Sequence, residues 1–525
     1  MLKFNRRQLL QFAASLTIVS SLKRVKRSHA LEVKEPKIEL TAWTHDARPL
    51  DDYTLEQLYF VDLAEEPLSP FWQEIDNGKL FSVAPKIPFA IALRFPVEGF
   101  GKVALYADND GKGYTPSDFP LNLNLAFASS RLHRVTKYLQ QHSDIDFSPS
   151  VVARLTRARK YLENAQNSDL LSPKIGWCNL SLVESLWAGE IAVFERARQA
   201  IAKNSVRPNF LFGANCSRYA PQMTEYNQRF ARLFNFATVP FYWKSFEPKR
   251  GQKNFARTDS MVEWLNRNQI QVKGHPLVYF HEAGTPDWLK DKSYAEVKQL
   301  TYQHAFEIAN HYRDKIAYYD IINEANQIPW ANALKYDREQ FLELTRIASE
   351  AAIAGNREVK RIINHCCIWG ENVAYGKPPQ DSPYQYIKRC LDAGIDFELI
   401  GLQVYYPNQD MFEIDRILER FATLNKPIHI TELGVSSAAT IDEKSHLKEP
   451  RGLWRRPWSE SIQADWIEQF YTICYSKPYI KAISWWDLAD GGNFWPHGGL
   501  LHADMQPKTS FYRLQRLIDR WQASR

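Results

Sequence analysis

From residue 206 onward, short apolar segments alternate with longer amphipathic segments, and this alternation restricts the possible folds more than any other feature. The short segments predict buried strands, and the amphipathic segments predict helices that cover a parallel sheet. Eight such units predict an α/β protein with a (β/α)₈ TIM barrel over 206–525. A doubly wound sheet is the alternative, but no glycine-rich phosphate loop follows any strand. The predicted strands are Phe210–Gly213, Phe236–Val239, Val272–Gly274, Ala317–Ile322, Arg361–Asn364, Leu399–Val404, Ile428–Thr431 and Ala482–Trp486.

Two regions of different character precede this barrel. Residues 31–120 alternate apolar and polar positions in short runs separated by proline and glycine. This pattern predicts a small antiparallel β domain, for which a sandwich is one possible arrangement. Residues 121–205 change to apolar spacings of three and four, which predicts a helical connector between the β domain and the barrel.

The first 30 residues have the features of an export signal. Arg6 and Arg7 precede an apolar stretch from Leu9 to Leu22, and small residues near Ala30 suit a cleavage site. The paired arginines resemble a twin-arginine signal. An uncleaved membrane anchor is the alternative, although the stretch is shorter than the roughly 20 residues that span a bilayer. We therefore expect an exported protein, periplasmic or extracellular, with no stable membrane insertion after cleavage.

Charge and cysteine content narrow the partners further. The formal charge of +6 includes seven lysines and arginines before residue 31, so the remaining chain has a formal charge of −1. A near-neutral protein lacks the electrostatic footprint of a nucleic-acid partner. The six cysteines form no Cys-x-x-Cys or Cys/His metal spacing. We expect a monomer with buried free thiols, no metal and no cofactor.

Two glutamates end predicted strands that are otherwise mainly apolar. Glu324 follows Asn323 at the end of strand four, and Glu432 follows Thr431 at the end of strand seven. Active sites of such barrels lie at the carboxyl ends of the strands. A pair of carboxyl groups can hydrolyse a glycosidic bond, one as acid and one as nucleophile, when they lie about 5–5.5 Å apart. Surplus aromatic rings, including 16 Trp and 25 Tyr, suit sugar stacking.

Several short motifs, in order, resemble glycoside hydrolase family 10, the xylanase family, over roughly residues 206–520. No single motif is specific, but the order and spacing of the motifs together are specific for this family. The matching segments are Trp243-Lys244, Glu247–Gln252, Gly274–Val278, Pro286, Trp288, Asp320, Asn323–Ala325, Gly401, Gln403, Ile430–Leu433, Leu500-Leu501 and Pro507-Lys508.

The resemblance implies a role for each matched residue. Glu324 would be the acid/base and Glu432 the nucleophile of a retaining enzyme that cleaves internal β-1,4 linkages of xylan. Asn323 would bind the 2-hydroxyl at the cleavage point. The other implied substrate-binding residues are Lys244 and His275 for glycone hydroxyls, Gln403 and Tyr405 near the nucleophile, and Trp485 as the sugar platform.

The chain also departs from the family pattern. Pro240 and Phe241 replace a Glu-Asn pair before the strand-two lysine, Tyr405 replaces a histidine, and Gly434 replaces an aspartate. Tyr279 and Phe280 stand where the family has an aromatic residue and a histidine after strand three. Sites built to hydrogen-bond a hydroxyl discriminate strongly, so these changes affect substrate choice more than catalysis. Another retaining β-glycanase, such as a glucanase or mannanase, and a catalytically silent glycan-binding protein stay open as alternatives.

Overall fold

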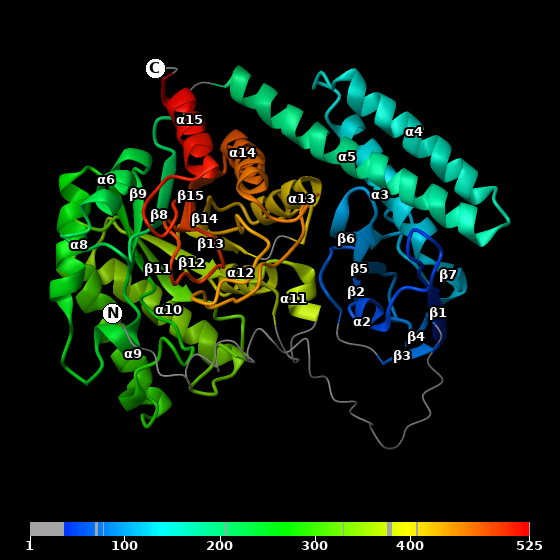
Figure 1. The fold of residues 1–525 in the computed structure, drawn as a ribbon. Coiled ribbons are helices and arrows are strands. Elements are labelled where there is room, and N and C mark those ends of the chain that lie inside the picture. The colour runs from blue at the N-terminus through cyan, green and yellow to red at the C-terminus, as the bar shows by residue number, and fades with distance from the viewer. Residues whose placement is uncertain are drawn as a thin grey trace.

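The computed structural model describes residues 36–68, 72–76, 78–204, 207–328, 330–374, 381–405 and 408–523. A barrel, two small sheets and three long helices make up the molecule (Figure 1). The predicted export signal, residues 1–30, lies outside the described residues. Among the helices that are described, none has both the length and the apolar character needed to cross a membrane.

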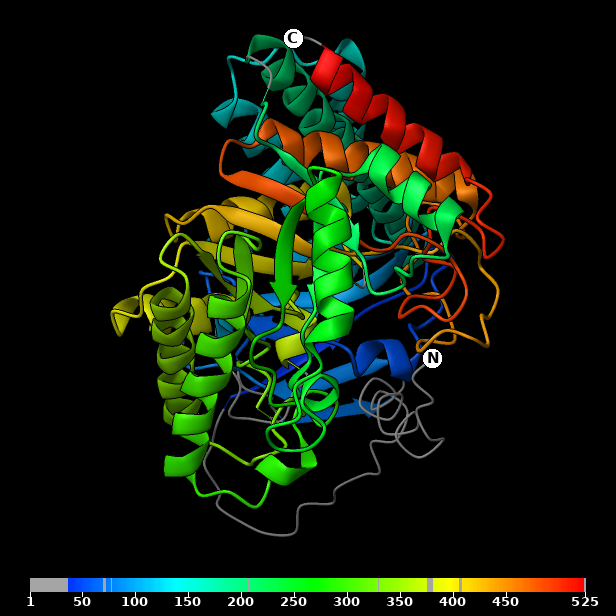
Figure 2. The same cartoon turned by 90° about the vertical axis from the view of Figure 1, so that its left-hand side faces the viewer.

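Eight parallel strands close into a barrel, which confirms the predicted (β/α)₈ fold (Figure 2). Each of the eight predicted segments overlaps one of these strands, with Phe210 and Ala317 one residue before the observed starts. Most strand positions are buried, as expected when both faces of a parallel sheet are covered. The strands are β8 (Leu211–Asn215), β9 (Phe236–Pro240), β10 (Gln271–His275), β11 (Tyr318–Asn323), β12 (Lys360–His365), β13 (Leu399–Val404), β14 (Ile428–Leu433) and β15 (Ile480–Asp487).

A ring of helices covers the outside of the barrel, one after each strand. Several begin with a capping box, in which a Ser or Asp side chain and a residue three positions later satisfy each other's backbone amides. These helices are α6 (Thr224–Leu233), α8 (Phe255–Arg267), α9 (Tyr294–His311), α10 (Arg338–Gly355), α12 (Pro383–Asp392), α13 (Met411–Ala422), α14 (Glu460–Ser476) and α15 (Thr509–Ala523), with the short helices α7 (Trp243–Phe246) and α11 (Gly370–Ala374) in the loops.

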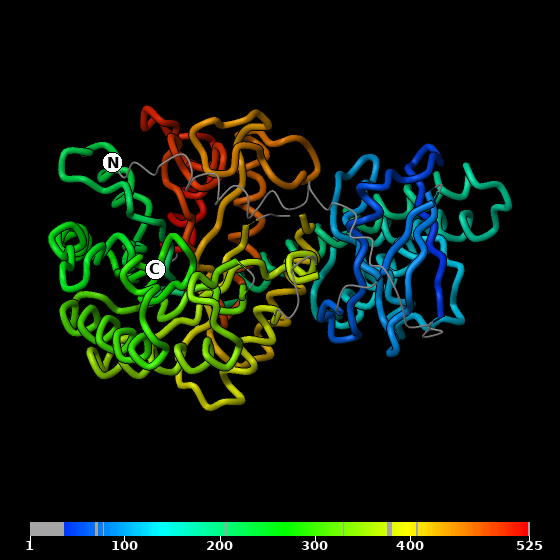
Figure 3. The backbone as a smooth tube through the Cα atoms, turned by 90° about the horizontal axis from the view of Figure 1, so that it is seen from below, coloured from blue at the N-terminus to red at the C-terminus, as the bar shows by residue number. Residues whose placement is uncertain are grey.

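The N-terminal region forms two small sheets beside the barrel (Figure 3). One sheet has the order β3-β4-β1-β7 and the other β2-β5-β6. Every strand pair here is antiparallel except β1 with β7, which is parallel, and β7 leads directly into the first long helix. The strands are β1 (Lys37–Thr41), β2 (Tyr59–Val61), β3 (Gln73–Asp76), β4 (Lys79–Val83), β5 (Ala90–Val97), β6 (Gly101–Ala107) and β7 (Leu121–Asn122), with the short helix α2 (Asp52–Leu55).

Three helices connect the sheets to the barrel: α3 (Leu123–Gln141), α4 (Pro149–Gln166) and α5 (Leu171–Lys203). They lie within the region predicted to be helical. Helix α5 packs against α3 and α4 on one side and against α13 and α14 of the barrel on the other. The connector is therefore a packed layer on the barrel and not an extended linker.

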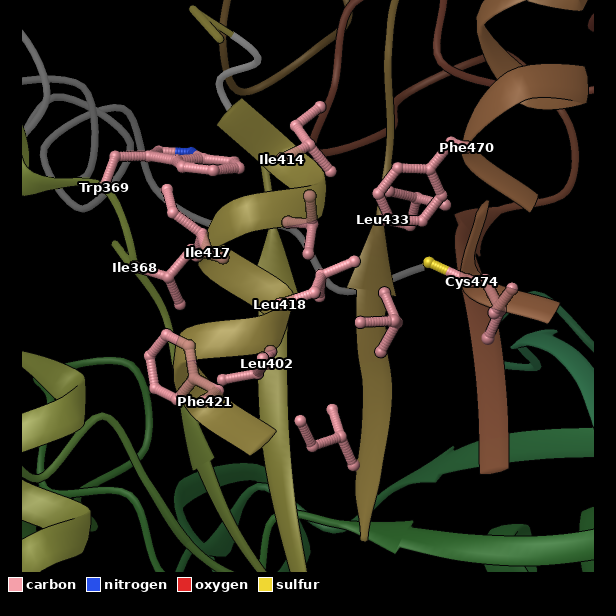
Figure 4. Close-up of a cluster of buried hydrophobic side chains, with 14 of the residues drawn as sticks. Ile368, Trp369, Leu402, Ile414, Ile417, Leu418, Phe421, Leu433, Phe470 and Cys474 are labelled. Atoms are coloured by element: carbon pink, nitrogen blue, oxygen red, sulfur yellow. The ribbon is translucent and has the colours of Figure 1, made fainter. Parts of the chain in front are cut away.

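The hydrophobic core is continuous from the sheets through the connector into the barrel wall. Figure 4 shows one part of it, where Leu402 of β13 and Leu433 of β14 meet the inner faces of α13 and α14. Burying large aliphatic and aromatic side chains stabilises a fold by about 1.5–3 kcal/mol each. This packing fixes the strands whose ends carry Gln403 and Glu432.

Candidate active site

Both glutamates lie at the carboxyl end of the barrel, as expected. Glu324 follows β11 directly and Glu432 lies near the end of β14, and both are buried. The backbone of Glu324 has φ of +55°, a left-handed conformation that costs a non-glycine residue about 1–3 kcal/mol. Its amide donates to the carbonyl of Asn364 at 2.9 Å, which helps to hold this conformation. Such strained residues cluster at functional sites.

The Glu324 carboxylate accepts hydrogen bonds from two side chains. The Tyr279 hydroxyl donates to Oε2 at 2.6 Å, and the Gln403 amide donates to Oε1 at 3.0 Å. Gln403 was expected near the nucleophile, and its backbone does pair with Glu432 in the sheet, but its amide contacts Glu324. These two donors fix the orientation of the carboxyl group toward the barrel mouth.

The Glu432 carboxylate has its own partners. The Asn364 amide donates to Oε1 at 3.1 Å and the Tyr405 hydroxyl donates to Oε2 at 3.2 Å. The Nε2 atom of His275 lies 3.8 Å from Oε1. Tyr405, which stands where the family has a histidine, thus contacts the predicted nucleophile directly.

A chain of buried amides joins the two glutamates. The Asn323 Oδ1 atom accepts from Asn364 Nδ2 at 2.8 Å and from Gln403 Nε2 at 3.2 Å. Asn364 in turn accepts from the Thr431 hydroxyl, which fixes which way its amide faces. Because each amide group is held by two partners, both carboxyl groups are positioned before any substrate arrives.

Burial and proximity couple the two carboxyl groups. Burial raises the pKa of Glu324 above its usual value. Burial, and next the charge of Glu324, raise the pKa of Glu432 to about 8. Two interacting carboxyl groups of this kind titrate as a pair, with apparent pKa values that belong to the pair. One protonated and one ionised carboxyl group is the state that acid-assisted nucleophilic attack requires.

His275 is buried beside Glu432 and is held by a second network. Its Nδ1 atom lies 2.7 Å from Asp320 Oδ2, which also accepts from the Lys273 ammonium at 2.6 Å. Burial opposes the ionisation of Asp320, but Lys273 and His275 hold its pKa below the usual value. Burial lowers the pKa of His275, which favours the neutral imidazole. The Nε2 atom lies 3.2 Å from the Tyr242 hydroxyl.

Two predicted residues lie apart from this cluster. The Lys244 ammonium donates to Asp287 at 3.0 Å and to the Glu282 carbonyl at 3.2 Å, at the rim of the site. Trp485 is completely buried, and its indole donates to the Gly498 carbonyl at 2.8 Å. A ring with no exposed face cannot stack on a sugar, so the assignment of Trp485 as the platform needs correction.

Trp486 is the better candidate for a sugar platform. Side chains alternate along a strand, so the neighbour of an outward Trp485 faces the barrel interior. The ring of Trp486 lies edge-on to His275, with ring centres 5.4 Å apart, and it packs with Tyr405 and Trp495. It therefore belongs to the cluster that contains Glu432.

Sequence reasoning gave no role to several residues that the structure places at the site, and it took Tyr279 only as a departure from the family pattern. The side chains of Tyr242, Tyr279 and Asn364 contact the glutamates or His275, and Lys273 contacts Asp320, the partner of His275. Asn364 and Lys273 lie within predicted strands, and their polar character there was a usable signal. Tyr242 follows a strand end, and nothing in its local pattern separates it from the buried Phe241.

The fold and the buried carboxyl pair together define a barrel of the glycoside hydrolase kind. The model of "Glycosyl hydrolase family 10" matches residues 202–516, and the chain belongs to this family. No group of three or more His, Cys, Asp or Glu side chains in the described residues could hold a metal ion.

The chain is similar to several characterised proteins. Beta-1,4-xylanase of Dictyoglomus thermophilum is 24% identical over 339 residues, which cover 59% of this chain and 89% of the relative. Endo-1,4-beta-xylanase B of Thermotoga neapolitana is 23% identical over 316 residues, covering 57% and 85%. Xylanase 10B of Thermotoga petrophila RKU-1, solved in complex with xylobiose, is 20% identical with a TM-score of 0.48, covering 62% and 97%.

Proposed function

We propose that this chain is a retaining β-glycanase that cleaves internal β-1,4 linkages of xylan or a closely related polysaccharide. The observation that carries the proposal is the pair of buried glutamates at the ends of β11 and β14, linked through Asn323, Asn364 and Gln403. Family membership and the names of the relatives, which are xylanases, favour xylan over other β-1,4-glycans.

The reaction would proceed in two steps. Glu324 donates its proton to the leaving oxygen while the Glu432 carboxylate attacks the anomeric carbon, so the glycosidic bond breaks and an ester forms. Glu324, now ionised, then removes a proton from a water molecule that attacks the same carbon and releases Glu432. Once Glu432 is esterified it carries no negative charge, so the pKa of Glu324 falls and the ionised group can work as a base.

A substrate panel on the full-length protein tests the proposal. We expect reducing ends from xylan, with slower or no release from β-1,4-glucan and β-1,4-mannan, and proton NMR should show the β-anomer as the first product. Faster release from glucan or mannan than from xylan would mean that xylan is not the preferred substrate. Binding without release from any of the three polysaccharides would mean a silent glycan-binding protein.

We also propose that the protein is exported by the twin-arginine route, on the strength of Arg6, Arg7 and the apolar stretch that follows. Expression of the full-length chain followed by cell fractionation should place the protein outside the cytoplasm. Replacing Arg6 and Arg7 by lysine should retain it inside the cell. Equal export of both forms would contradict the proposal.

A further inference from the structure

The N-terminal β domain touches the loops at the carboxyl end of the barrel, where the site lies. In Figure 1, α11 lies between the barrel and strands β2 and β6. Ala374 of α11 packs in one apolar cluster with Tyr59, Val61 and Tyr106 of the β2-β5-β6 sheet. The backbone amide of Ala104 in β6 also donates to the carbonyl of Asn408, which lies in the loop after β13, at 2.8 Å. The β domain thus reaches the loops after two neighbouring barrel strands.

A third contact involves the loop after β14. Gly101 of β6 forms a backbone bridge with Trp454 in this loop. The Trp454 indole donates at 2.8 Å to Glu190 of α5, which is fully buried and also pairs with Arg455. Removing one partner of a buried ion pair is strongly destabilising, so these contacts hold the domain in one place.

Glu371 of α11 joins the β domain to the loop after β13. Its Oε2 atom accepts from the Tyr59 hydroxyl at 3.4 Å. Its Oε1 atom accepts from Asn408 Nδ2 at 3.3 Å and from Gln409 Nε2 at 3.0 Å. A single carboxylate therefore holds one strand of the β domain and two side chains of a barrel loop.

The same two loops carry the partner of the predicted nucleophile. Trp369, two residues before Glu371, donates its indole hydrogen to the Tyr405 carbonyl at 2.6 Å. The Tyr405 hydroxyl donates to Glu432. Tyr59 is thus connected to Tyr405 through its hydrogen bond to Glu371, the short chain segment from Glu371 back to Trp369, and the Trp369 indole.

We propose that the N-terminal β domain is a structural part of the active site, in which Tyr59 and Glu371 act as positioning residues that hold Tyr405 against Glu432. The family match begins at residue 202, so the β domain and nearly all of the connector lie outside the part that this chain shares with the family. The loops after β12 and β13 therefore depend here on contacts that the barrel alone does not supply.

The first test measures amide hydrogen exchange in the full-length protein and requires no activity. We expect Glu371→Gln and Tyr59→Phe to speed exchange in peptides covering β13 and the adjoining Tyr405, without a change in peptides covering β9. Glu339→Gln and Tyr302→Phe are the controls, because both side chains are exposed and lie on helices α10 and α9 of the barrel. Unchanged exchange near Tyr405 would overturn the inference.

The second test is kinetic and rests on the proposed function. Glu371→Gln should lower kcat by about 2-fold to 30-fold with KM little changed, the range typical of residues that act through a neighbour. Tyr405→Phe should lower kcat as well, and the double variant should be no slower than Tyr405→Phe, because both changes act on one contact. Additive losses in the double variant would contradict the inference.

The two proposals can fail separately. If the wild-type protein releases no sugar from any β-1,4-glycan, the proposed function is wrong, and hydrogen exchange alone decides the positioning role. If the wild type is active and exchange near Tyr405 does not respond to Glu371→Gln, the positioning role is wrong and the proposed function stands.

Discussion

On the side of the barrel mouth formed by β11 to β14, Asn323, Asn364 and Gln403 join the two glutamates through buried hydrogen bonds. On the side formed by β9 and β10, Lys244, which was expected to bind glycone hydroxyls, pairs with Asp287. Phe241, which replaces a polar residue of the family, is packed in the core. The first side holds the carboxyl groups for chemistry, and the second would meet the glycone sugar. Under the proposed function, the difference would mean that the arrangement for bond cleavage is maintained while the recognition of the glycone sugar is rebuilt.

The largest effect should come from the first side. Glu432→Ala should lower kcat by at least about 10³-fold, because no glycosyl-enzyme can form. Azide should restore turnover of an aryl glycoside with inverted stereochemistry, since a small anion fits the vacated space. Kinetics with and without azide, with Glu350→Gln as an exposed control, check this. Activity of Glu432→Ala within tenfold of wild type would remove Glu432 from the mechanism.

Glu324→Ala should lower the rate of hydrolysis less than Glu432→Ala does, and the size of the loss should depend on the leaving group. Poor leaving groups need protonation, so their hydrolysis should fall by about 10²–10⁴-fold. Good leaving groups need little protonation, so a burst of aryl product followed by slow release is expected. Stopped-flow measurement of the burst tests this. Equal losses for both kinds of substrate would speak against Glu324 as the acid.

The pH profile tests whether the two carboxyl groups share a proton. The pKa of Glu432 is raised to about 8 by burial and by the charge of Glu324, so wild-type kcat/KM should fall as pH rises above this value and the shared proton is lost. It should also fall at low pH, when both groups are protonated. Glu324→Gln removes the neighbouring charge, which lowers the pKa of Glu432 and should abolish the basic limb with an activated substrate. A retained basic limb would assign it to another group.

The two sides also differ in how far the sequence alone predicts them. The sequence predicts the barrel from the alternation of short apolar and longer amphipathic segments. It predicts Glu324 and Glu432 from apolar runs that end in a carboxylate, and both signals are local in the chain. The choice between Trp485 and Trp486 depends on which side of β15 faces the interior, and a register error of one residue reverses it. The contacts of Lys244 with Asp287 and of Tyr59 with Glu371 join distant segments, and no local pattern encodes them.

On the recognition side, Tyr242→Phe should have a modest effect. Its hydroxyl is hydrogen-bonded to the Nε2 atom of His275. By resemblance to the family, His275 would bind a glycone hydroxyl. Removing the hydroxyl frees His275 for the sugar, so KM should fall for xylo-oligosaccharides while kcat changes by less than about tenfold. Tyr302→Phe, an exposed tyrosine, is the control. An increase in KM would mean that the Tyr242 hydroxyl itself binds the sugar.

Phe241→Ala should have the smallest effect on specificity, although it should affect stability. The Phe241 ring has no exposed surface and packs against Phe246, Tyr312 and Tyr319. Truncation of such a ring costs about 3–5 kcal/mol, because contacts are lost and a cavity remains. Short and long oligosaccharides should then be affected equally, in proportion to the protein that remains folded.

Thermal unfolding together with kcat/KM on oligosaccharides of increasing glycone length separates packing from sugar binding at this position. Phe470→Ala is the matched control, because that ring is equally buried but lies between α14 and the barrel wall, away from β9. If both variants lose stability and neither changes the length dependence, Phe241 is a packing residue and the distal glycone contacts of the family are absent here. A loss confined to longer substrates in Phe241→Ala would instead make its ring a sugar platform, and the second side of the mouth would then keep a subsite by apolar contact.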